Sequence, residues 1–156
     1  MFRSVRLRTI LIFGLVAGLL GQERQPWFGV WNLKVTPPAR YKRVTSRIDP
    51  WNDGLKVTYE MVGLRGGVTH WEWTGRFDGK DYPVQGADTV LTNAYRKIDD
   101  RSYEIVIKVD GNLAAVSRVA VSGDGKTLQV ATEERVAGGK TVKTTAEYER
   151  ASPVSH

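Results

Sequence analysis

Short segments that alternate between apolar and polar residues recur along this chain roughly every ten residues, with turn-forming dipeptides between them. The alternation is clearest over 55–61 and 102–109, where odd positions are apolar and even positions are polar apart from Val106. A period of two predicts β-strands with one buried face. Positive φ angles for tight hairpins are supplied by Asp-Gly at 53–54, 78–79, 110–111 and 124–125 and by Gly-Gly at 66–67 and 138–139.

Strands joined by short hairpins form an up-and-down meander, and no stretch after residue 22 has the apolar period of a helix. An open sheet of about nine strands would leave two unpaired edges and an uncovered apolar face. The sequence therefore predicts an all-β fold, an up-and-down antiparallel meander β-barrel of about 8–10 strands. A β-sandwich is the alternative, although it needs a long crossing connection. The remaining strands are expected near 28–35, 42–49, 67–77, 88–97, 112–122, 127–136 and 140–149.

A chain of 156 residues, 41% of them hydrophobic, is long enough for one domain with its own core. We expect a single barrel over 27–150, followed by a tail over 151–156. The chain has no cysteine, which excludes disulfides, zinc–thiolate sites, thiol catalysis and a lipid-bearing cysteine. The barrel must therefore be stabilised by packing alone.

The first 21 residues have the pattern of a signal peptide. Three arginines lie within the first eight residues, an apolar segment spans 10–20, and polar residues follow Gly21. The apolar segment is too short to span a bilayer comfortably. We predict cleavage after Gly18 or Gly21, which places the mature protein in the periplasm or outside the cell. An uncleaved N-terminal anchor is the alternative.

Much of the positive charge belongs to this leader. The whole chain has a net charge of +6, whereas the residues after 21 contain 20 basic and 17 acidic side chains, a net charge of +3. The basic residues are scattered singly along strands and turns, where solvent-facing positions carry charge. A nucleic-acid footprint needs clustering on one face. We therefore expect no nucleic-acid partner, and no membrane contact beyond the signal segment.

The order of these features resembles a known group of barrels. Gly-Val-Trp stands at 29–31 on the first predicted strand, and Ala-Glu-Tyr-Glu-Arg stands at 146–150 on the last. The turns at 78–84 and 123–128 are similar to those of exported bacterial proteins of the same group. Over roughly 27–150 the chain resembles the calycin superfamily, most closely the bacterial lipocalin-like and fatty-acid-binding-protein-like barrels.

The resemblance implies a barrel that binds an apolar or amphipathic molecule. It also implies that Trp31 closes one barrel end, with a basic side chain from a late strand against its ring. Arg150 is the candidate for that side chain, and Arg135 is the alternative. Vertebrate fatty-acid-binding proteins place an arginine two residues before the last-strand tyrosine, where this chain has Ala146 before Tyr148. They also insert two helices that the segment 35–42 is too short to form, so a fatty acid is disfavoured as the ligand.

Aromatic residues on most strands are the candidates for a ligand pocket. On one strand, Trp71, Trp73 and Phe77 share a face, and His70 and Glu72 lie on the other; burial of the larger apolar area turns the rings inward. The same rings could instead fill the interior completely, so a usable cavity and a solid core both stay open. The candidate ligand-binding residues are Trp31, Tyr59, Trp71, Trp73, Tyr95, Tyr103 and Tyr148.

No group of residues indicates catalysis, a metal site or a cofactor. His70 is interpreted as a surface residue, with axial ligation of haem as the alternative. Arg118 is expected to face solvent, and an inward Arg118 that pairs with a ligand carboxylate is the alternative. Adjacent acidic residues at 99–100 and 133–134 point to opposite faces of a strand and cannot converge.

The favoured function is an exported barrel that binds a small apolar or amphipathic molecule without catalysis. The alternative is an envelope protein-interaction or inhibitor barrel with a filled core, whose partner is a protein of the cell envelope. That alternative rests on Trp27, Phe28 and Trp51, which lie at or beside loops, where their rings could be exposed to a partner. An enzyme ranks third.

Overall fold

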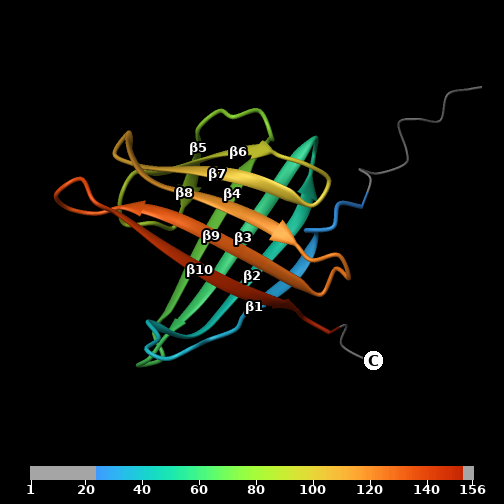
Figure 1. Cartoon of the computed structure of the whole chain (residues 1–156), viewed down its shortest axis with the longest axis horizontal. Helices are drawn as coiled ribbons and strands as arrows, with labels where there is room; N and C mark the ends of the chain where they lie inside the picture. The colour runs from blue at the N-terminus through green and yellow to red at the C-terminus, as the bar shows by residue number, and fades with distance from the viewer. Residues whose placement is uncertain (1–23, 153–156) are drawn as a thin grey trace, which may run out of the picture.

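Ten antiparallel strands make up the computed structural model, which describes residues 24–152 (Figure 1). Within those residues the fold is all-β, because each alternating segment buries one face and exposes the other. The strands are β1 (Gly29–Leu33), β2 (Tyr41–Trp51), β3 (Gly54–Gly63), β4 (Val68–Gly75), β5 (Tyr82–Gln85), β6 (Leu91–Lys97), β7 (Ser102–Val109), β8 (Asn112–Val121), β9 (Thr127–Arg135) and β10 (Thr141–Arg150).

The strands close into a barrel in which every strand pairs with its neighbours in sequence. Closure is made by β1 and β10, where Trp31 lies opposite Arg150 and Leu33 opposite Tyr148. The predicted meander barrel is thus confirmed, and the sandwich alternative is wrong because the sheet has no free edges.

One strand was missed by the sequence pattern. β5 is only four residues long and contains Pro83, and it pairs with β4 and β6 through two residue pairs on each side. The expected turn region after 78–79 therefore contains a short strand. A proline cannot donate to the ladder, which is why the segment did not stand out as a strand.

The two ends of the barrel differ in construction. The described chain enters beside the start of β1 and leaves beside the end of β10, and both points lie on the same side in Figure 1. The β9–β10 hairpin lies on the opposite side. We call the end that contains residues 24–28 and the β2–β3, β4–β5, β6–β7 and β8–β9 connections the sealed end.

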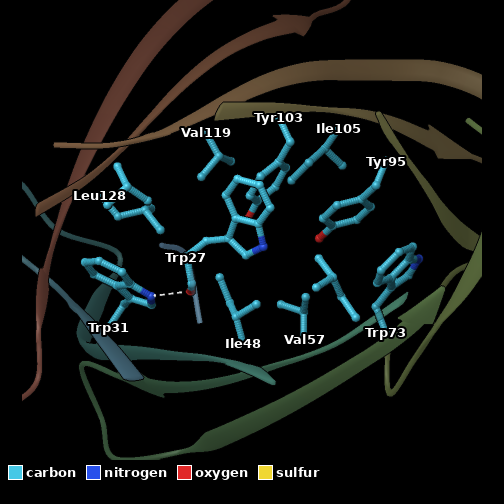
Figure 2. Packing of buried hydrophobic residues seen from close by; sticks show 12 residues of the cluster. Trp27, Trp31, Ile48, Val57, Trp73, Tyr95, Tyr103, Ile105, Val119 and Leu128 are labelled. Atoms are coloured by element: carbon cyan, nitrogen blue, oxygen red, sulfur yellow. Dashed lines mark hydrogen bonds between the residues drawn. The ribbon is translucent and has the colours of Figure 1, made fainter. Parts of the chain in front are cut away.

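The inward faces of the strands form one cluster of buried side chains. On β8, Ser117, Val119 and Val121 are buried and Arg118 between them is exposed, which confirms the predicted outward Arg118. On β4, Trp73 is buried and His70 is exposed, as predicted. Figure 2 shows the cluster with Trp27 in the middle of the surrounding side chains.

The predicted signal segment, 1–21, lies outside the described residues. Among residues 24–152, no helix has the length and apolar character needed to cross a membrane.

Candidate ligand cavity

The segment before β1 folds across the sealed end and inserts an indole into the core. Trp27 has an exposed fraction of 0%, and its ring meets Phe77 and Tyr103 edge to face at centroid distances of 5.5 and 5.3 Å. The Trp31 Nε1–H donates to the backbone carbonyl of Trp27 at 2.9 Å (Figure 2). The expectation that Trp27 is exposed is therefore wrong, because a ring of this size gains more by filling the barrel end than by facing water.

Arg150 on β10 binds the segment before β1 through hydrogen bonds and a cation–π contact. Its guanidinium carbon lies 4.2 Å from the centroid of the Trp31 ring, and its Nη1 and Nη2 donate to the carbonyls of Phe28 and Pro26 at 2.6 and 2.7 Å. Its Nε donates to the Gly125 carbonyl in the β8–β9 turn at 2.8 Å. A planar fork of donors suits this arrangement, since Arg can reach several carbonyls at once.

The glycine of the Gly-Val-Trp sequence makes room for that arginine. Gly29 has a φ of +130°, and a Cβ at this position would lie 2.6 Å from Arg150 Nη1. A side chain would displace the guanidinium and strain the backbone. Arg135, the alternative partner for Trp31, lies at the far end of β9, exposed.

The interior is filled unevenly. Beside Trp31, Tyr103, Leu128 and Tyr148 the remaining void is only about 10 Å³. A cavity of about 250 Å³ lies against the inward faces of β3 to β9. Its walls are Val57, Tyr59, Trp71, Glu72, Trp73, Val84, Leu91, Asn93, Tyr95, Ile105, Ile107, Ser117, Val119 and Val130.

The candidate residues from the sequence divide between these two regions. Tyr59, Trp71, Trp73 and Tyr95 line the cavity. The other three, Trp31, Tyr103 and Tyr148, lie around the small void in the packed part of the barrel, which Tyr59 also reaches. The interior is thus a packed half joined to a hollow half.

The rings of the cavity wall differ in how they are held. Trp73 stacks on Tyr95 with centroids 3.9 Å apart, and its Nε1–H lies 3.2 Å from the carbonyls of both Tyr82 and Asn93. Trp71, half-buried on the same face of β4, forms no ring pair with another aromatic side chain of the described residues. Trp73 is therefore fixed by protein contacts, whereas the Trp71 ring is available to a guest.

Apart from Glu72, the polar groups of the wall are uncharged. Burial raises the pKa of Tyr59, an effect partly offset by the nearby Ser46 hydroxyl. Burial also raises the pKa of Tyr95 well above its usual value, although a hydrogen bond from the Asn93 side-chain amide opposes the shift. Both tyrosines therefore stay protonated at neutral pH. The Ser117 hydroxyl is hydrogen-bonded to the Thr132 hydroxyl at 2.7 Å. Asn93 Oδ1 is buried and has no hydrogen-bond partner among residues 24–152.

Glu72 is the one lining residue with a carboxylate, and a cation neutralises it from outside the cavity. Its Oε1 lies 3.3 Å from Lys56 Nζ, and both side chains are about one-third exposed. In the part of the chain that the structure describes, no lysine, arginine or histidine lines the cavity. The wall thus offers no positive charge to a bound anion.

Two wall residues, Val84 and Leu91, come from β5 and from β6, which pairs with it, and no pattern in the sequence marks them as candidates. Asn93 was also not singled out, although its odd position on β6 shares a face with Tyr95. That shared parity is the signal that could have found it. For residues 24–152, no three His, Cys, Asp or Glu side chains lie close enough together to hold a metal ion.

Comparison with known proteins adds no family assignment: no protein-family model matches the chain, and no curated protein matches it in sequence.

Proposed function

We propose that this protein is an exported, calycin-like barrel that binds a small apolar molecule in the cavity between β3 and β9 and carries out no catalysis. The observation that carries the proposal is the cavity of about 250 Å³ with mostly apolar walls inside an otherwise packed barrel. A void of this size costs stability, because the side chains around it lose packing contacts. A bound apolar guest would restore those contacts.

The calycin-like assignment is supported by the combination of features at the sealed end. A closed meander begins with Gly-Val-Trp, and the basic side chain that covers the tryptophan ring comes from the last strand. The size of the cavity sets the scale of the guest. It exceeds the roughly 150 Å³ of an engineered cavity that binds benzene, and it lies just below the range of about 300–1,000 Å³ typical of ligand pockets.

A larger side chain that projects from the wall into the cavity tests the proposal. Ile107 lines the cavity, and its neighbour Val106 lies on the outer face of β7. We expect Ile107→Trp to weaken binding of N-phenyl-1-naphthylamine, an uncharged fluorescent probe, at least about tenfold. Val106→Trp adds a ring of the same kind outside the barrel and should bind like the wild type.

The fluorescence titration is paired with native mass spectrometry of protein purified gently from its own host. A guest mass present on the wild type and Val106→Trp, and absent from Ile107→Trp, would support the proposal. Equal probe binding by both variants would place the probe elsewhere and contradict it.

A second candidate, a barrel whose ligand is another protein, is favoured by apolar side chains exposed away from the sealed end. Leu64, Val68 and Val90 lie in or beside the connections between β3 and β4 and between β5 and β6. Trp51, which lies at the sealed end, is also exposed, in line with this alternative. A protein that stays bound to wild type, Val106→Trp and Ile107→Trp alike, with no small guest, would support this candidate.

A further inference from the structure

The chemistry of the cavity wall indicates which kinds of apolar molecule the cavity can bind. This inference rests on the proposed function. The wall lacks a cation within the described residues, and its only carboxylate is paired with Lys56. A carboxylate guest would give up its hydration without gaining a counter-ion, which is the costly case for buried charge. Arg118 cannot supply the charge, because it lies exposed on the outer face of β8.

The wall also favours a flat guest. Trp71 presents a half-buried ring with no aromatic neighbour, and aliphatic side chains of β3 and β7 complete the apolar surface, among them Val57 and Ile107. Aromatic rings prefer offset stacking or edge contacts with other rings. A cavity of about 250 Å³ is larger than one ring needs, so a guest of two fused rings matches it.

A polar group of the guest has a place to bind. The amide of Asn93 lies in the wall next to Tyr95, and its Oδ1 is a buried acceptor without a protein hydrogen bond among residues 24–152. An unpaired buried acceptor is destabilising until a donor reaches it. A guest hydroxyl could supply the missing hydrogen. The neutral Tyr59 hydroxyl offers a further partner.

We propose that the cavity selects an uncharged, flat compound of about two fused rings that carries a hydroxyl group, and that it discriminates against the corresponding carboxylate. Trp71 stacks on the guest, and Asn93 accepts the hydrogen bond from its hydroxyl.

Three compounds of one shape test the proposal on the wild-type protein by isothermal titration at neutral pH: 2-naphthol, 2-methylnaphthalene and 2-naphthoate. At this pH the phenol is neutral and the carboxylate is ionised. We expect 2-naphthol to bind about tenfold more tightly than 2-methylnaphthalene and at least about 100-fold more tightly than 2-naphthoate. The variant Asn93→Leu should remove the advantage of 2-naphthol over 2-methylnaphthalene and leave the weak binding of 2-naphthoate unchanged.

The outcomes separate this inference from the proposed function. If N-phenyl-1-naphthylamine binds in the cavity but 2-naphthoate binds as well as 2-naphthol, the selection of neutral guests is wrong and the binding function stands. If 2-naphthol and 2-methylnaphthalene bind equally in the wild type, the role of Asn93 is wrong. If the naphthalene compounds and the uncharged probe all fail to bind, both proposals fail. The wild-type series gives these answers even if Asn93→Leu does not fold.

Discussion

Trp27 belongs to no strand, yet its side chain fills one end of the core. Its ring is surrounded by the inward faces of the strands, and its backbone carbonyl accepts the hydrogen bond from Trp31. Nothing in the period-two pattern includes it, because it precedes the first strand. Its burial follows from the shape of the barrel end, which a local sequence pattern does not describe.

Removing this ring should cost far more stability than removing an exposed one. We expect Trp27→Ala to lower the free energy of unfolding by about 3–5 kcal/mol, because it leaves a large cavity at the sealed end. Trp51 is the matched control: it is 47% exposed, with Lys56 Nζ 5.1 Å from its ring centroid. Trp51→Ala should cost about 1 kcal/mol or less. Urea denaturation of both variants gives the comparison, and equal losses would show that Trp27 does not support the core.

At the scale of the strands, the barrel wall is held by the fewest residue pairs at β5. β2 and β3 pair without interruption from Arg43 to Trp51, whereas β5 makes only two residue pairs on each side. Beyond β5 the chain is held close to β4 at Gly86, which has a φ of +89° and no room for a Cβ against the His70 carbonyl. This part of the wall borders the cavity through Val84 on β5 and Trp71 on β4.

The hydrogen bonds between β5 and its two neighbours should open more often than those in the rest of the barrel. In hydrogen-exchange mass spectrometry, we expect amides of β5 to exchange through local opening, well before those of β2 and β3, which should require near-global unfolding. The β7–β8 pair serves as an internal control, since its ladder extends along the whole of β7. Protection of β5 equal to that of β3 would contradict this expectation.

Most of the strands could be predicted from sequence because alternation is a local signal of one-sided burial. The segments around 55–61 and 102–109 fall within β3 and β7, and each Asp-Gly pair lies at a connection between two strands, with Gly54 already the first residue of β3. β5 could not be predicted in this way, because four residues around Pro83 are too few to show a period. The inward position of Trp73 could be predicted from the alternation along its strand, yet alternation alone cannot distinguish a packed interior from a hollow one. That difference depends on how side chains from distant strands fit together.

At the scale of the whole molecule, the barrel encloses four tyrosines from different strands, and burial raises the pKa of each hydroxyl. Burial raises the pKa of Tyr59, and that of Tyr95 and Tyr103 much further; the pKa of Tyr148 is also raised. In the unfolded chain a tyrosine ionises near pH 10. Because the folded state keeps these groups neutral, their contribution to stability is complete below about pH 10 and is lost as the pH rises further.

We therefore expect cooperative unfolding in alkali, in which the phenolate absorbance of the buried tyrosines rises together with the loss of the near-ultraviolet circular dichroism signal. Tyr103→Phe removes one ionisable group from the packed half of the barrel and should shift the alkaline transition to higher pH. Ionisation of all the tyrosines while the dichroism signal stays native would show that their hydroxyls reach water in the folded state.

The contacts of Arg150 link residues that lie far apart in the sequence: from the last strand it donates hydrogen bonds to the carbonyls of Phe28 and Pro26, which are 122 and 124 positions away. During synthesis these two carbonyls are made before any of the ten strands, and the guanidinium that binds them is made at the end of β10. Arg150 can therefore hold the segment that carries the Trp27 indole only after the last strand has been made. A chain that stops before this arginine would lack the hydrogen bonds that hold Pro26 and Phe28 against the last strand.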